Sequence, residues 1–291
     1  MTILVLGGRG KTASRLSSML HIAGVPFLVG SRSTAHVSSY KLTHFDWLNE
    51  DTWRNGFLRA SLDNMDPISA IYLVGGHAPE FVDPGLRFID FARAQGVHRF
   101  ILVSASNTDK GTHSMGILHA HLDSIEDVQY VVLRPTWFME NMLEDPHLGW
   151  IKKESRIYSA TGDGKIPFIS ADDIARVAFR ILTDWESQSA QEYFILGPEL
   201  LSYGQIADIL TTVLDRKITH VSLAEEDFAR LLRDDVGLPP DFATMLASME
   251  TDVKHGAEER RGSHDVKNVT GSSPRSFLEF AGKERSHWME R

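Results

Sequence analysis

Three small residues near the start of the chain have a spacing that brings backbone N–H groups close to an anion. Gly7, Gly10 and Ala13 form a Gly-x-x-Gly-x-x-Ala pattern between an apolar run and a segment of helical period. In such a pattern the first glycine permits a tight turn, the second lets the backbone approach a pyrophosphate, and the small third residue lets the helix pack closely. The helix N-terminus adds partial positive charge. We therefore predict a dinucleotide-binding loop in which Gly7, Gly10, Lys11 and Thr12 contact phosphates.

The segment that follows the second apolar run carries a positive charge. It reads Gly30-Ser31-Arg32-Ser33. A site selective for NAD usually places Asp or Glu here to bind the ribose 2′-hydroxyl, whereas Arg suits the 2′-phosphate of NADP. Ser31 and Ser33 can add hydroxyl donors. We predict NADP(H) with Arg32 at the phosphate; the alternatives are NAD(H), or a solvated loop in which Arg32 binds nothing.

One common arrangement of catalytic residues is incomplete in this chain. Short-chain dehydrogenases carry Ser after the fifth strand and Tyr-x-x-x-Lys on the next helix, where the tyrosine protonates the alkoxide that hydride addition creates. Ser104 is present here, but Met115 stands in the tyrosine position and His119 in the lysine position. Methionine has no proton to give. We therefore predict no catalytic acid–base residue in this chain.

Two explanations of the missing acid stay open. The protein could bind a dinucleotide without catalysis, as a sensor does. Alternatively, its substrate is an iminium ion, which accepts hydride and becomes a neutral amine without needing a proton. Such a reaction needs chiefly orientation and a suitable electrostatic pocket. The aromatic run Trp137-Phe138 would suit a cationic, aromatic ligand, although runs of this kind are also common in protein cores.

The elements that must position these residues alternate between strands and helices. Short apolar runs predict strands at 2–6, 26–29, 41–45, 70–74, 100–103, 130–133 and 192–196, and helical periodicity is clear at 172–182, 203–214 and across much of 223–254. Apolar strands of this kind are typical of a parallel sheet covered on both faces. We predict an α/β fold: a doubly wound parallel (Rossmann) sheet with a smaller, helix-rich C-terminal substrate lobe. We expect residues 1–140 to form the NAD(P)-binding part and 141–291 the substrate-binding part, interleaved with the last strands.

Composition excludes several classes of protein. The 291 residues include no cysteine, which removes disulfides and thiolate metal sites, and the histidines form no ligand pattern, so we predict no metal. The net charge of −9 argues against a nucleic-acid partner. No apolar run has the length of a membrane span and the N-terminus has no signal-peptide pattern, so we expect a cytoplasmic protein that does not bind membranes. A homo-oligomer stays open.

Longer runs of the sequence resemble a known family. The segments 2–13 and 172–175 resemble the NmrA-like branch of atypical short-chain dehydrogenases. The segments 44–48, 164–170 and 215–220 are similar to the festuclavine and agroclavine dehydrogenases of fungal ergot alkaloid biosynthesis, and the run 134–141 together with 164–170 is the more specific part of the likeness. This resemblance implies NADPH-dependent reduction of the cyclic iminium ion formed from chanoclavine-I aldehyde, a small-molecule alkaloid intermediate. The alternative is a non-catalytic, NADP-sensing regulator of the NmrA kind.

The resemblance and the expected strand ends together suggest further site residues. Gly75 and Ser104 would lie beside the nicotinamide, and His119 would contact its ribose unless it is only a satisfied helix histidine. The candidate substrate contacts are His77, Trp137, Phe138, Tyr158 and Phe168.

Overall fold

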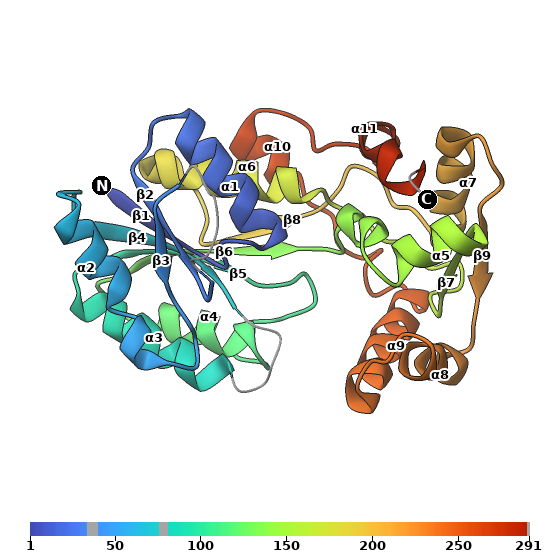
Figure 1. Cartoon of the computed structure of the whole chain (residues 1–291), viewed down its shortest axis with the longest axis horizontal. Coiled ribbons are helices and arrows are strands. Elements are labelled where there is room, and N and C mark those ends of the chain that lie inside the picture. The colour runs from blue at the N-terminus through green and yellow to red at the C-terminus, as the bar shows by residue number, and fades with distance from the viewer. Residues whose placement is uncertain (34–39, 76–80, 290–291) are drawn as a thin grey trace. The chain divides into compact units, whose positions relative to one another are not determined.

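The computed structural model describes residues 1–33, 40–75 and 81–289 of the chain (Figure 1). The chain divides into two compact units, each built from several segments. Unit 1 comprises Met1–Pro135, Ala171–Ile195 and Asn268–Gly271, and unit 2 comprises Thr136–Ser170, Leu196–Lys267 and Ser272–Arg291.

Unit 1 is built on a seven-stranded sheet in the order β3-β2-β1-β4-β5-β6-β8, and every neighbouring pair is parallel. The strands are β1 (Thr2–Leu6), β2 (Phe27–Ser31), β3 (Leu42–His44), β4 (Ile68–Val74), β5 (Arg99–Val103), β6 (Gln129–Pro135) and β8 (Glu192–Ile195). The strand order reverses between β1 and β4, the place where ligands collect in open parallel sheets. The predicted doubly wound α/β fold is confirmed.

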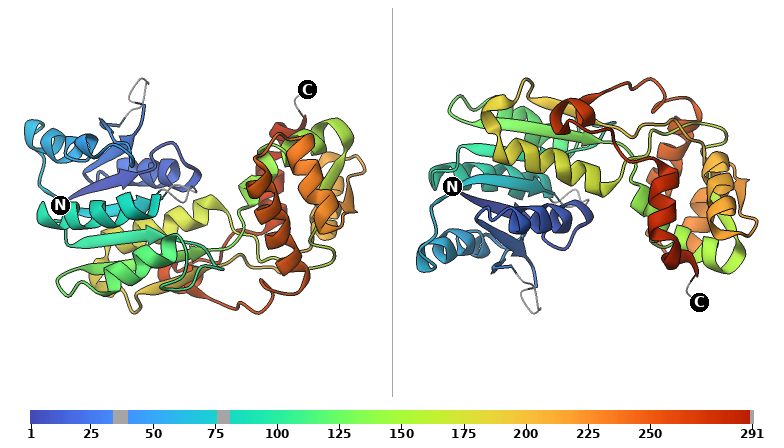
Figure 2. Two further views of the ribbon diagram at one scale, coloured as in Figure 1. Left: turned by 90° about the horizontal axis from the view of Figure 1, so that it is seen from below. Right: turned by 90° about the horizontal axis from the view of Figure 1, so that it is seen from above.

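Helices cover both faces of this sheet (Figure 2). On one face lie α1 (Lys11–Ile22) and α6 (Ala171–Thr183), and on the other lie α2 (Asn55–Leu62), α3 (Val82–Ala94) and α4 (Met115–Asp123). All five residues of β1 are buried because neither face of the strand meets water. A short 3-10 turn, η1 (Glu50–Thr52), precedes α2, and η4 (Trp185–Ser187) precedes β8.

Unit 2 is mostly helical, as the sequence predicts. Its elements are η3 (Met139–Leu143), α5 (His147–Glu154), α7 (Tyr203–Leu214), α8 (Glu225–Asp234), α9 (Pro240–Lys254), α11 (Phe277–Met289), and a parallel strand pair, β7 (Arg156–Ser159) with β9 (Thr219–Ser222). Helix α10 (Asp265–Thr270) lies where the chain returns to unit 1. The aromatic rings of Phe168, Tyr203, Phe277 and Phe280 form much of the core. Among the described helices, none is long and apolar enough to cross a membrane.

Candidate functional site

The turn between β1 and α1 has the geometry of a phosphate loop. Gly7 has a φ of +72°, and the N–H of Gly10 donates to the Gly7 carbonyl at 2.6 Å, which closes the turn. A Cβ on Gly8 would lie 2.1 Å from the Cγ1 of Val29 on β2, so a side chain has no room there. Gly8 is therefore a third glycine that this turn needs, and the Gly-x-x-Gly-x-x-Ala pattern does not include it. The adjacent Gly-Gly pair was the only signal for it in the sequence.

Helix α1 begins directly after this turn. Its N-cap residue, Gly10, has no side chain that could accept from the first N–H groups of the helix. Uncapped N–H groups at a helix start favour a bound anion. Lys11 and Thr12 form the first turn of the helix, and Thr12 is buried. The structure thus brings together the four predicted phosphate contacts, whose roles stay predictions.

The end of β2 lies beside the phosphate loop. The N–H of Gly8 donates to the Gly30 carbonyl at 3.3 Å, which links the loop to the strand. Arg32 follows the strand, is exposed, and has no ion-pair partner among the described residues. The backbone N–H of Ser33 donates to the Ser31 hydroxyl at 3.4 Å. An exposed guanidinium in this place is available to a 2′-phosphate, the contact that we predict for it.

The ends of β4 and β5 bring Gly75, Ser104 and Met115 to one edge of the sheet. A Cβ on Gly75 would lie 2.3 Å from the Met115 Cε and 2.5 Å from the Phe81 Cε1, so both side chains pack directly on this glycine. The Ser104 N–H donates to the Leu133 carbonyl at 2.8 Å. Its buried hydroxyl has no hydrogen-bond partner in the described part of the chain. The described part of this edge therefore presents the Gly75 backbone under two apolar side chains, and beside it the Ser104 hydroxyl.

His119 lies one helical turn beyond Met115, inside unit 1. Only 4% of the residue is exposed, and its ring lies 5.8 Å from the ring of Tyr130, edge to face. Burial lowers the pKa of His119 below its ordinary value, so the imidazole is neutral at pH 7. It cannot supply the positive charge that a lysine would carry in this position. Its contact with the nicotinamide ribose stays a prediction.

The predicted substrate contacts fall into separate places, and His77 lies outside the described residues. Trp137 and Phe138 are half-buried at the start of unit 2, where Phe138 forms a parallel bridge with Ile169. This bridge brings the aromatic run next to Phe168. Phe168 itself is only 2% exposed and packs edge-on against Tyr203 at 5.6 Å, as a core residue does.

Tyr158 belongs to a different cluster of unit 2. Its ring packs edge-on against Trp150 at 5.1 Å, and its hydroxyl donates to Glu154 at 2.7 Å. Among the described residues, no ring contact joins it to Phe168 or to the aromatic run. The substrate roles of Trp137, Phe138, Tyr158 and Phe168 stay predictions.

Comparison with known proteins places the chain in a family. Festuclavine dehydrogenase of Aspergillus fumigatus is 81% identical over 289 residues, which are 99% of each chain. Festuclavine synthase I of Penicillium roqueforti is 56% identical across 99% of this chain and 100% of that protein. Agroclavine dehydrogenase of Claviceps fusiformis is 45% identical across the full length of both. The chain belongs to the festuclavine and agroclavine dehydrogenase family. The family that the sequence resembles is therefore confirmed, although no general family model matches the chain.

Solved structures share the fold of this festuclavine and agroclavine dehydrogenase family member. An NADPH-dependent quinone oxidoreductase from Escherichia coli is 21% identical, with a TM-score of 0.77 across 99% of this chain and 100% of that one. NmrA, a negative transcriptional regulator in complex with NADP, is 14% identical, with a TM-score of 0.74 across 99% of each chain. At these identities the likeness establishes the NmrA-like fold alone.

Proposed function

We propose that this protein is an NADPH-dependent oxidoreductase that reduces the cyclic iminium ion formed from chanoclavine-I aldehyde. We propose festuclavine as the product, because the 81% identical relative is a festuclavine dehydrogenase and the agroclavine dehydrogenase is only 45% identical. Agroclavine is the alternative product. We further propose that the protein works in the cytoplasm on this small-molecule alkaloid intermediate.

The phosphate loop supports the cofactor in this proposal. A glycine at φ +72°, a second glycine with no room for a Cβ, and a helix that begins at a glycine N-cap suit a pyrophosphate. Arg32 lies exposed at the end of the neighbouring strand, which favours NADPH over NADH. When bound, NADPH supplies a hydride to the iminium carbon.

The position of Met115 is the main support for the proposed chemistry. Its methyl group packs on Gly75, where a short-chain dehydrogenase would present a tyrosine hydroxyl. Closure of the amine on the aldehyde takes up one proton, releases water and leaves a C=N⁺ bond. Hydride addition at the carbon then turns the C=N π electrons into the nitrogen lone pair, so the hydride step itself needs no proton. Met115 and Phe81 shield this edge of the sheet, and Ser104 offers a neutral hydroxyl there.

A regulator that senses NADP is the second candidate, because Met115 also fits a protein without catalysis. The test is to mix purified protein and NADPH with chanoclavine-I aldehyde, once as it is and once after a partner reductase has reduced its alkene, to follow the absorbance of NADPH, and to identify the product by mass spectrometry. We expect NADPH to be consumed only with protein present. Festuclavine should accumulate from the alkene-reduced aldehyde, because one hydride added to the iminium carbon leaves a carbon–carbon double bond in place. NADPH binding without consumption beyond the protein-free control would reject the reductase and favour the regulator.

A further inference from the structure

One loop links the two residues that stand at the catalytic positions of a short-chain dehydrogenase. It runs from the end of β5 to the start of α4, with Ser104 at its first residue and Met115 just beyond its last. The backbone of the loop at first continues along β6. The Ser104 N–H donates to the Leu133 carbonyl and the Ser106 N–H to the Pro135 carbonyl, both at 2.8 Å. Beyond Ser106 the loop leaves the sheet and needs other contacts to hold its shape.

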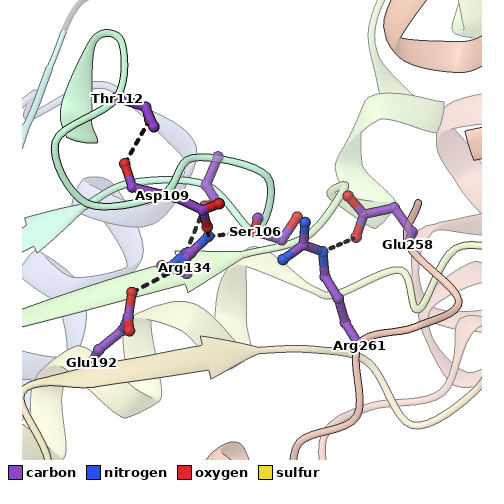
Figure 3. Close-up of polar contacts among 8 residues, drawn as sticks. Ser106, Asp109, Thr112, Arg134, Glu192, Glu258 and Arg261 are labelled. Atoms are coloured by element: carbon purple, nitrogen blue, oxygen red, sulfur yellow. Dashed lines mark hydrogen bonds and ion pairs between the residues drawn. The ribbon is translucent and has the colours of Figure 1, made fainter. Parts of the chain in front are cut away.

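Arg134 of β6 supplies those contacts from beneath the loop (Figure 3). Its Nε donates to the Ala105 carbonyl at 3.2 Å and its Nη2 to the Ser106 carbonyl at 2.8 Å. The same Nη2 reaches the Asp109 carboxylate at 2.7 Å, and Nη1 reaches Glu192 of β8 at 2.8 Å. Only 5% of the Arg134 side chain is exposed. The Arg134 guanidinium therefore holds Ala105, Ser106 and Asp109 of the loop against the sheet.

The far half of the loop is tied to α4 through Asp109. Its carbonyl accepts from the Thr112 N–H at 3.1 Å and from the Thr112 hydroxyl at 2.6 Å. A Cβ on Gly116 would lie 2.2 Å from this carbonyl oxygen, so Asp109 packs against the first turn of α4. The Gly111 N–H also donates to the Gly116 carbonyl at 2.7 Å. Met115 is thus placed by the same residue that Arg134 holds.

We propose that Arg134 is a positioning residue for hydride transfer, and that it acts by holding Ser104 and Met115 in register at the edge of the sheet. This inference rests on the proposed reductase function. The positioning role requires the planar guanidinium of Arg134, because four acceptors in different directions need separate N–H groups. A lysine keeps the charge but not the fork. Misplacement of a reacting site by about 1 Å can lower turnover about 100-fold.

The test compares Arg134→Lys and Asp109→Asn with Arg93→Ala as the matched control. Arg93, on α3, forms an exposed ion pair with Asp127, and both residues lie outside the loop. Three quantities are measured on each protein: hydrogen exchange of the loop amides between residues 104 and 112, NADPH-binding sites per chain by fluorescence titration, and kcat per NADPH-binding site. Asp109→Asn keeps Arg134 and Glu192, so it remains informative if the buried substitution fails to fold.

We expect kcat per site to fall about 100-fold in Arg134→Lys and about tenfold in Asp109→Asn. Loop exchange should accelerate in both variants while the NADPH-binding sites are retained, and Arg93→Ala should behave as wild type. A purely structural role would instead lower the number of sites and leave kcat per site unchanged. That result, or loop exchange equal to wild type in both variants, overturns the inference. Failure of the proposed function shows itself separately, as a wild-type protein that binds NADPH without consuming it.

Discussion

Glu250 offers a sharp test of how unit 2 is stabilised. It lies on α9 with 4% of its surface exposed, and its carboxylate accepts a hydrogen bond from the Ala160 N–H at 2.5 Å. Burial disfavours the charged form and raises the pKa of Glu250 from 4.5 to about 8. The nearby hydroxyl of Tyr203 is also buried and has no hydrogen-bond partner among the described residues. The substitution Glu250→Gln keeps the shape of the neutral acid but removes its ionisation, so it isolates the effect of this one titration on stability.

The sign and size of the effect follow from the two pKa values. Between pH 4.5 and about 8 the unfolded chain has released this proton while the folded chain still holds it. The free energy of unfolding of the wild type therefore falls as the pH rises through this window, by about 1.4 kcal/mol per pH unit. Because glutamine does not ionise, Glu250→Gln should be more stable than wild type by about 1 kcal/mol at pH 5 and about 4 kcal/mol at pH 8.

Urea unfolding of both proteins at pH 5, 6, 7 and 8 measures this difference directly. Other groups titrate over the same range, but they are common to both proteins and cancel in the comparison. Glu226→Gln, an exposed position on α8, is the matched control and should show no pH-dependent difference from wild type. If Glu250→Gln is less stable than wild type at pH 8, or if the difference does not grow between pH 5 and pH 8, the reasoning is wrong.

Three further predictions concern the site in unit 1. Arg32→Ala should weaken NADPH binding about 10- to 100-fold in a fluorescence titration and leave NADH binding nearly unchanged; equal losses would remove Arg32 from the 2′-phosphate. Met115→Leu should keep most of the NADPH consumption with chanoclavine-I aldehyde, because no proton is required there; a folded variant without turnover would contradict the acid-free mechanism. Gly8→Ala should abolish dinucleotide binding, because its Cβ would lie 2.1 Å from the Val29 side chain. Gly262→Ala, at a position with open space, is its control, and binding by a folded Gly8→Ala would argue against a tight loop.

The sequence predicts elements of both units well wherever one pattern dominates. The expected strand at 70–74 is the end of β4, because an apolar run marks a strand buried on both faces. The helix expected at 203–214 has the observed bounds, Tyr203–Leu214. Ser202 and Gln205 form a capping box that fixes its first residue. Local patterns are sufficient in these cases because the local preference and the final packing agree.

Elements with weak local signals escaped prediction. Helix α2 contains Gly56 and an exposed apolar residue, Leu62, so its helical period is blurred. The strand pair β7 and β9 has only four residues in each strand, and Arg156 pairs with Thr219, more than sixty positions away in the sequence. Pairing at such a distance is set by the packing of unit 2 and leaves no periodic trace in the sequence.

The candidate site divides in the same way. Gly7, Gly10 and Arg32 follow from motif spacing, because a phosphate loop is a local structure. The burial of His119, which lowers its pKa, involves the ring of Tyr130 on β6, so the sequence of helix α4 alone does not reveal it. Arg134 stands in a run that suggests the family, but its contacts lie 25 to 58 positions away, so only the folded chain shows what it holds.

Met115 and Phe81 make the sheet edge at Gly75 apolar, and this affects which hydride acceptors the site favours. Hydride transfer to a carbonyl group creates an anion and a cation from two neutral partners, so it needs a proton donor or an oxyanion hole. Hydride transfer to an iminium ion only moves an existing positive charge from one ring to another. The Met115 methyl group and the Phe81 ring, both packed on Gly75, make this surface apolar. An apolar surface disfavours the creation of two new charges far more than the movement of one existing charge. These two apolar side chains therefore favour the closed iminium form of the proposed substrate over its open aldehyde as the hydride acceptor.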